Sequence, residues 1–304
     1  MVVLRELMCP GLELELVRSL RAADVSTGKR SALFSIRRVL LAQHTAFPVS
    51  GADLYEELLS CTAILSTGHP RLDELLDSGL FTGELTELAG PPGTGKTQVC
   101  FGVAVHIAHF LKQGVIFIDT TGASPQPDSS TCCRQRLAAL QRIHVFRLFD
   151  LLSLLDCLYS LRRSGLQQVS VGGACVRAVI VDSVSALASP LLGTRHMEGL
   201  PLMAQLAVVL KAMVKDFNLA ALVTNHVTRE SSGGSVRPAL GVSWSHAPRT
   251  RLLLEHAHTS AQHTSASQSS WRSATLIKSS RQVPAEQARY MCAILFFNRL
   301  THLL

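Results

Sequence analysis

The chain has 304 residues, of which 47% are hydrophobic and 17% are charged. This composition supplies one large core with room for a small additional module, and it argues against extensive disorder. Lys and Arg number 29 against 22 Asp and Glu, which gives a formal net charge of +7. A basic balance of this kind suits a partner that carries phosphates, and it equally fits a solvated basic face.

The sequence shows no pattern typical of export or membrane insertion. Arg5 and Glu6 interrupt what would have to be an apolar signal core, and no apolar run is long enough to span a bilayer. The eight cysteines include no CxxC pair, and Cys100 and Cys175 lie in apolar stretches. We therefore expect a soluble intracellular protein with reduced core thiols rather than disulfides or a zinc site.

Residues 1–46 predict a small helical N-terminal module. Between residues 12 and 43 the chain is basic, and its apolar residues recur at helix spacing. Residues 47–51 then interrupt the helical pattern, because proline removes a backbone donor and glycine admits unusual backbone angles. We expect a linker over residues 47–60.

Beyond the linker, short aliphatic runs alternate with amphipathic segments. The runs are 115–118, 179–181 and 220–223, and a helical stripe precedes the last of them. Alternation of this kind predicts an α/β fold over residues 61–282, in which helices cover both faces of a mostly parallel sheet. The stripe consists of Leu202, Leu206, Val209, Leu210 and Met213, with Gln205, Lys211 and Lys215 pointing outward.

Two stretches are poor in structural signal. Residues 122–136 are rich in Ser, Pro and Gln, and residues 256–270 consist largely of His, Ser, Thr and Gln. Segments with so few apolar residues are expected to be loops or disordered.

Residues 90–97 read Gly-Pro-Pro-Gly-Thr-Gly-Lys-Thr, which is a complete Walker A pattern. A strand-like run precedes it and a helix-like run follows, as a phosphate-binding P-loop requires. Glycines let backbone N–H groups wrap the phosphates, Lys96 reaches the β and γ phosphates, and the Thr97 hydroxyl ligates magnesium. A glycine-rich turn without a nucleotide is the alternative. The predicted nucleotide-binding residues here are Gly90, Pro91, Pro92, Gly93, Thr94, Gly95, Lys96, Thr97 and Gln98.

Two further strands end in carboxylates. The apolar run 176–181 ends at Asp182, as expected for a buried Walker B strand that delivers a magnesium-holding carboxylate to the phosphates. An aspartate that caps a turn is the alternative. Rapid hydrolysis also needs a group that orients the attacking water. Asp119 ends the other strand and is the candidate for that task, although a structural role at the strand end fits it better.

Several motifs surround the Walker A segment: Thr67-Gly68, Leu72-Asp73, Gly79-Leu80, Thr82-Gly83-Glu84, Thr86-Glu87 and, near the end, Lys278-Ser279-Ser280-Arg281-Gln282. Together they resemble the eukaryotic RecA-type recombinases, in particular the DNA-repair paralogues of the main strand-exchange recombinase, and among these the D paralogue group. The resemblance implies a RecA-like P-loop ATPase core behind the small helical module.

The same resemblance implies a nucleotide site in which Lys96, Thr97 and Asp182 bind ATP and Mg²⁺. Active recombinases carry a catalytic Glu before the glycine of their third motif, whereas this chain has Thr121. A hydroxyl cannot act as a general base near neutral pH. Hydrolysis is therefore expected to be slow unless Asp119 or a residue of a partner substitutes.

Residues Thr224-Asn225-His226 resemble the family's Thr-Asn-Gln sensor, which couples the γ phosphate to a DNA-binding loop. Asn225 and His226 are accordingly expected at the nucleotide, although a polar histidine at a strand end is the alternative for His226.

Two basic loops look like the family's DNA-facing loops, at residues 190–199 and 229–238. Flexible basic loops suit the irregular backbone of single-stranded DNA, and solvated surface loops are the alternative. The candidate DNA contacts are Arg195, Arg229 and Arg237, with His196 beside the first of them.

Two segments bear on assembly. Phe47 lies near the position where the family inserts a Phe into the next subunit, although packing on its own core explains it equally well. From residue 283 to 304 the family pattern is absent, so we expect a divergent C-terminal tail that fails to complete the sheet edge.

The resemblance implies a nuclear protein of homologous recombination repair that binds single-stranded DNA, sister paralogues and the main recombinase, with ATP as an assembly clamp. The alternatives are a motor ATPase with the same core, against which Thr121 speaks, and a small-molecule kinase, which would need an arginine-bearing lid.

Overall fold

The structure, a computed structural model, describes residues 18, 50–122, 138–166, 174–194, 196–229, 236–256, 271–284 and 287–291. The chain divides into two compact units, Met1–Ser60 and Cys61–Leu304. The helix α3 (Gly51–Cys61), all but the last residue of which belongs to the first unit, begins where the Ser50 hydroxyl accepts a hydrogen bond from Asp53 N, 3.1 Å away. A helix therefore occupies most of the expected linker. The predicted module boundaries stay a prediction, because Phe47 and, apart from residue 18, residues 1–46 lie outside the described residues.

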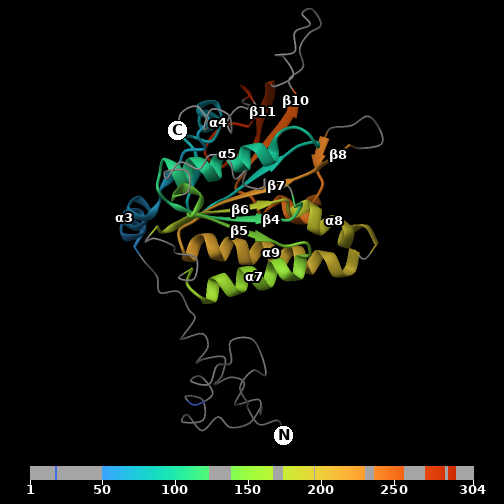
Figure 1. Ribbon diagram of the computed structural model, residues 1–304, viewed down its shortest axis with the longest axis horizontal. Helices are drawn as coiled ribbons and strands as arrows, with labels where there is room; N and C mark the ends of the chain where they lie inside the picture. Colours follow the sequence, from blue (N-terminus) through green and yellow to red (C-terminus); the bar gives the residue numbers. More distant parts are fainter. Residues whose placement is uncertain are drawn as a thin grey trace, which may run out of the picture. The chain divides into compact units, whose positions relative to one another are not determined.

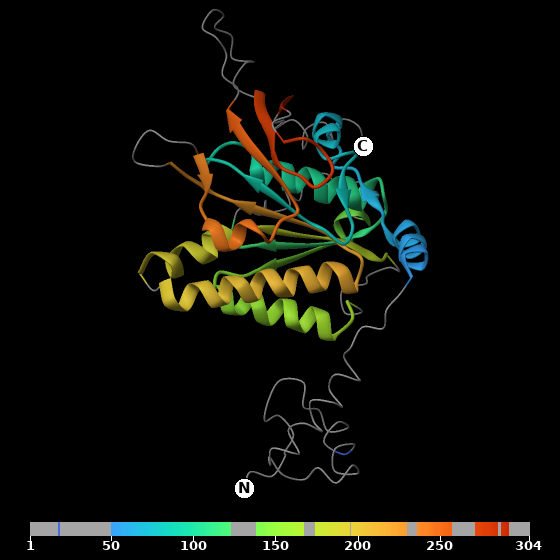
Figure 2. The same cartoon turned by 180° about the vertical axis from the view of Figure 1, so that it is seen from behind.

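An eight-stranded sheet forms the centre of the second unit, in the order β12-β11-β10-β3-β7-β6-β4-β5 (Figures 1 and 2). Six strands are parallel and two continue the sheet in antiparallel fashion. The parallel strands are β3 (Leu85–Ala89), β4 (Gly114–Asp119), β5 (Ile143–Arg147), β6 (Val176–Asp182), β7 (Ala220–Asn225) and β10 (Thr250–His256). The antiparallel strands are β11 (Trp271–Lys278) and β12 (Gln287–Met291).

Helices cover both faces of this sheet, as Figure 1 shows and as the sequence predicts. One face carries α4 (Pro70–Leu75) and α5 (Lys96–His109). The other carries α7 (Leu151–Arg163), α8 (Val184–Thr194), α9 (His196–Asp216) and α10 (Gly241–Ser245). The described residues also form two small antiparallel pairs: β1 (Ile64–Leu65) with β2 (Leu80–Phe81), and β8 (Val227–Arg229) with β9 (Val236–Pro238).

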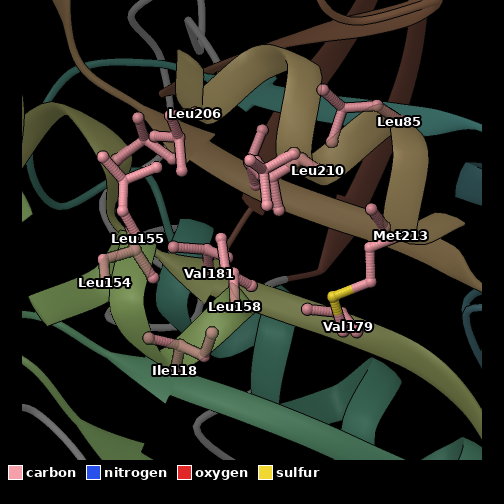
Figure 3. Packing of buried hydrophobic residues seen from close by; sticks show 14 of the residues in the cluster. Leu85, Ile118, Leu154, Leu155, Leu158, Val179, Val181, Leu206, Leu210 and Met213 are labelled. Atoms are coloured by element: carbon pink, nitrogen blue, oxygen red, sulfur yellow. The ribbon is translucent and has the colours of Figure 1, made fainter. Parts of the chain in front are cut away.

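The core consists of two apolar layers, one on each face of the sheet. Strands β3, β4 and β7 are buried at every position, because a parallel sheet between helices meets apolar side chains on both sides. The predicted stripe of α9 is confirmed: Leu206, Val209, Leu210 and Met213 are buried, while Gln205, Lys211 and Lys215 are exposed. Figure 3 shows this stripe packed against α7 and the strands.

Three expectations are wrong. Residues 190–199 are mostly helical, because α8 runs to Thr194 and α9 starts at His196. The tail does complete the sheet edge, since β12 pairs with β11 over five residues. Cys175 is exposed just before β6 rather than buried in the core, whereas Cys100 is fully buried. Among the residues that the structure describes, none of the helices is long and apolar enough to cross a bilayer.

Candidate nucleotide-binding site

The P-loop joins β3 to α5 through a backbone that only glycine can follow at several positions. Gly93 and Gly95 have φ angles of +77° and +90°, which side chains strongly disfavour. A Cβ atom on Gly90 would lie 2.5 Å from the Leu254 carbonyl oxygen, so the loop leaves no room for a side chain there. The crest of the loop, Pro92 and Gly93, is exposed. The glycines of the motif thus shape an open cradle of backbone groups at the start of α5.

Lys96 folds back onto this loop. Its Nζ donates to the carbonyl oxygens of Gly90 and Pro91 at 2.7 and 2.8 Å, and the side chain is buried. Burial lowers the pKa of Lys96, and the nearby Asp182 carboxylate opposes this shift. A bound triphosphate would offer this ammonium charged acceptors in place of neutral carbonyls, which strengthens its hydrogen bonds.

Asp182 ends β6 on the α5 face of the sheet, where it is buried and accepts a hydrogen bond from the Thr224 hydroxyl. Thr97, the second residue of α5, is half-buried, and Gln98 is exposed. Magnesium bound with a nucleotide usually takes one or two protein ligands and fills its remaining positions with water and phosphate oxygens. One carboxylate and one hydroxyl beside a buried lysine therefore fit an Mg²⁺-triphosphate.

Asp119 serves the turn after β4. Its Oδ1 accepts hydrogen bonds from the N–H groups of Thr121 and Gly122, at 3.0 and 2.8 Å, and from the Thr121 hydroxyl at 3.2 Å. The carboxylate is buried. This geometry favours the structural role at the strand end, and the Thr121 hydroxyl is itself directed at Asp119.

The sequence analysis missed three hydroxyls that connect the strand ends. The Thr120 hydroxyl bridges β4 and β6: it accepts from Ser183 N at 2.6 Å and donates to Ser183 O at 2.8 Å, across a cis Asp182-Ser183 peptide. Ser183 Oγ lies 3.3 Å from Ser185 Oγ, which accepts from His226 N at 3.0 Å. These residues tie the Walker B strand to the sensor segment, and a short polar run after a buried strand was their only signal.

The sensor residues point in different directions. Asn225 is fully buried, and its Nδ2 donates to Glu87 Oε1 at 2.6 Å, on the face of the sheet opposite Thr224. Its Nδ2 is thus committed to Glu87, so a contact with the nucleotide stays a prediction. His226 is half-buried, and its pKa is lowered by burial and by nearby Lys96, against the effect of Asp182. A contact between His226 and the nucleotide likewise stays a prediction.

Glu87 and Arg251 are a second pair that the sequence analysis missed. Arg251 Nε lies 2.5 Å from Glu87 Oε2, and both side chains are buried. With Asn225 they connect the three adjacent strands β10, β3 and β7. A lone acidic residue inside an otherwise uncharged buried strand was the available signal.

The candidate DNA contacts are only partly described. Arg195 lies outside the described residues, and Arg229 is the last residue of β8. Arg237 is exposed on β9, opposite Thr228 in the β8–β9 ribbon. The second basic loop therefore begins and ends in a two-stranded ribbon, and its residues 230–235 lie outside the described part of the chain.

Comparisons with known proteins identify relatives of this chain. A family model described as Rad51 matches residues 60–270. The chain is 46% identical over 309 residues to DNA repair protein RAD51 homolog 4 of Bos taurus, covering 92% of each chain. It is 30% identical over 239 residues to DNA repair protein RAD51 homolog 2 of Mus musculus, covering 64% of this chain and 66% of the other. A crystal structure of the RadB recombinase shares the fold, with a TM-score of 0.58 at 21% identity, covering 75% of this chain and 96% of that one.

Proposed function

Because this chain belongs to the Rad51 family, we propose that it acts in homologous recombination repair of DNA double-strand breaks as a nuclear, ATP-binding paralogue. Its relatives are DNA repair proteins by name, and the net charge of +7 suits a phosphate-bearing partner. In this proposal the chain binds single-stranded DNA and sister paralogues.

One observation carries the nucleotide part of the proposal. A buried lysine lies on a P-loop whose glycines leave an open backbone cradle, and the Walker B carboxylate of Asp182 is close enough to affect its pKa. Lys96 and the loop amides would hold the phosphates, and Thr97 with Asp182 would hold Mg²⁺. When bound, ATP supplies a charged group that a second subunit can recognise.

An assembly clamp fits these residues better than a motor. Thr121 offers a hydroxyl where the resemblance implies a carboxylate, and Asp119 is engaged by three hydrogen bonds in its own turn. With weak hydrolysis, a bound nucleotide persists, and nucleotide binding and partner binding then stabilise each other.

Calorimetric titration with Mg-ATP tests the site. We expect binding by the wild type and at least about tenfold weaker binding by Lys96→Ala, because hydrogen bonds to a charged group are lost. Lys215→Ala is the matched control, since Lys215 is exposed on α9. In Asp182→Asn, the difference between the affinity for ATP with Mg²⁺ and the affinity for ATP without Mg²⁺ should be smaller than in the wild type. A wild type that binds no Mg-ATP would overturn the proposal.

Co-purification with sister paralogues tests the clamp. Assembly should require Mg-ATP and should be lost in Lys96→Ala but not in Lys215→Ala. Turnover in the presence of DNA should stay well below about 1 per second, the scale of a motor enzyme. Assembly that is unaffected by nucleotide, or turnover above that rate, would reject the clamp.

A further inference from the structure

A row of three side chains lies beside the P-loop at the antiparallel edge of the sheet. His256 of β10, Arg272 of β11 and Tyr290 of β12 are successive cross-strand partners. Such partners point to the same face of a sheet, and Tyr290 belongs to the apolar layer on the α5 face. The row therefore lies on the face that carries the P-loop.

Two members of the row donate hydrogen bonds to the loop, and the third lies beside it. Tyr290 Oη donates to Thr94 O at 3.4 Å, and Arg272 Nη2 donates to Gly93 O at 3.5 Å. The His256 ring lies 3.9 Å from the position that a Cβ atom on Gly93 would occupy. The two donors come from 196 and 179 residues along the chain, so the contacts depend on the completed sheet edge.

These contacts affect the direction in which the N–H groups of the loop point. In a trans peptide the carbonyl and the following N–H point in opposite directions. A donor that fixes the carbonyls of Gly93 and Thr94 from the sheet edge therefore turns the N–H groups of Thr94 and Gly95 away from that edge. On the other side of the loop, Lys96 donates hydrogen bonds to the carbonyl oxygens of Gly90 and Pro91. Oriented N–H groups of this kind are what binds phosphate.

Tyr290 is packed on the side away from the loop. The ring is buried, and its edge meets His69, with 6.3 Å between ring centroids. His69 in turn packs on α5 at Gly102, where a Cβ atom would lie 3.3 Å from its Nε2. The position of the Tyr290 hydroxyl thus depends on packing, through His69, against α5, the helix that follows the P-loop.

We propose that Tyr290 and Arg272 are positioning residues of the nucleotide site, which pre-orient the P-loop amides for the phosphates of the ligand. The inference rests on the nucleotide site of the proposed function, and it makes β12, within the divergent tail, a part of that site. The ligand class concerned is a polyphosphate, because the oriented groups are amides rather than contacts to a base or a sugar.

Calorimetric titration of the full chain with Mg-ATP, and separately with inorganic triphosphate, tests the inference. Tyr290→Phe removes one neutral hydrogen bond and keeps the ring, so affinity for both ligands should fall about two- to tenfold. The unfolding midpoint without ligand should stay at the wild-type value. Tyr159→Phe is the control, because that hydroxyl accepts only an exposed hydrogen bond from Gln205, at 3.0 Å, among the contacts described for it. Arg272→Gln should act like Tyr290→Phe.

The outcomes separate this inference from the proposed function. A fall of about two- to tenfold in the affinities for both ligands in Tyr290→Phe and Arg272→Gln, with an unchanged unfolding midpoint, supports it. If the wild type binds Mg-ATP and Lys96→Ala does not, while both variants bind like the wild type, the inference is overturned and the nucleotide site stands. A lowered midpoint with unchanged affinity likewise overturns it, since the residues are then structural. A wild type that binds neither ligand overturns both.

Discussion

Arg251 donates through Nε to Glu87 Oε2 at 2.5 Å inside the sheet, where the Glu87 side chain is fully buried. The other carboxylate oxygen of Glu87 accepts from Asn225. Two ionised groups are costly to bury, and the pair is tolerable only while both charges and their hydrogen bonds are present. The free energy of unfolding should therefore respond strongly to loss of one partner and weakly to replacement of both.

Arg251→Met should lower the free energy of unfolding by about 3–5 kcal/mol, because it leaves the Glu87 carboxylate buried without its counter-ion. Adding Glu87→Gln should restore much of this loss, since glutamine still offers an oxygen to Asn225. Urea denaturation measures both. The control is Arg162→Ala at the Arg162–Asp216 pair, whose side chains are 41% and 43% exposed, and which should cost less than about 1 kcal/mol. If the single and double variants lost the same free energy of unfolding, the expectation would be refuted.

Asp119→Asn should leave the rate of phosphate release in the presence of DNA within about threefold of wild type, because asparagine keeps the oxygen that accepts three hydrogen bonds in its turn. A general base contributes about a hundredfold or more. A fall of that size, in protein with an unchanged unfolding midpoint, would identify Asp119 as the base after all.

Thr121→Glu places a carboxylate where the resemblance implies one. Phosphate release should rise at least about tenfold, since a positioned carboxylate can act as a general base and a threonine hydroxyl cannot. Thr121→Gln, which has the same length without the charge, is the matched control. Equal rates for the two variants would contradict the assignment of this position.

Arg237→Ala should weaken single-stranded DNA binding to a similar degree for different base sequences, because an exposed arginine on a ribbon offers a contact to phosphates. Removing one phosphate contact should reduce the slope of log affinity against log salt concentration by about 0.7. Arg163→Ala, at the exposed end of α7, is the control for net charge. Fluorescence anisotropy over a salt series gives both quantities, and an equal slope change in the two variants would remove Arg237 from the interface.

Acidification should destabilise the fold in part through His69. Burial lowers the pKa of His69, with Asp73 opposing and His106 adding to the shift. The unfolded chain then binds a proton more readily than the folded one, so the stability is fully present above the unfolded value of about 6.5 and is lost as pH falls toward the folded pKa. His69→Gln should show a shallower loss of unfolding free energy between pH 8 and about pH 5.5. His109, which is more exposed on α5 and has a shift of the same sign, serves as the comparison. Parallel pH curves for His69→Gln and wild type would exclude the effect.

The sequence by itself determined the parts of the site that are continuous in the chain. The Walker A segment can be recognised in the sequence because phosphate binding needs glycines, a lysine and a threonine at fixed spacing within one loop. Asp182 could be predicted as the end of the Walker B strand because a fully buried strand has to be apolar up to the residue that leaves the core. The sheet and the α9 stripe followed from periodicity alone, since alternating buried runs and amphipathic helices have few other ways to pack.

The tertiary structure decided what depends on residues far apart in the chain. Glu87 meets Arg251 across 164 positions and Thr94 meets Tyr290 across 196, and no local pattern encodes such a pairing. The pairing of β3 with β7 brought Asn225 to Glu87, and the pairing of β12 with β11 added residues 287–291 of the tail to the sheet edge. Residues 190–194 and 196–199 are helical although they include Pro190, Gly193 and Gly199, because packing on neighbouring elements outweighs weak local propensity. Local chemistry thus specified the phosphate-binding loop, and long-range packing specified the groups that hold it in place.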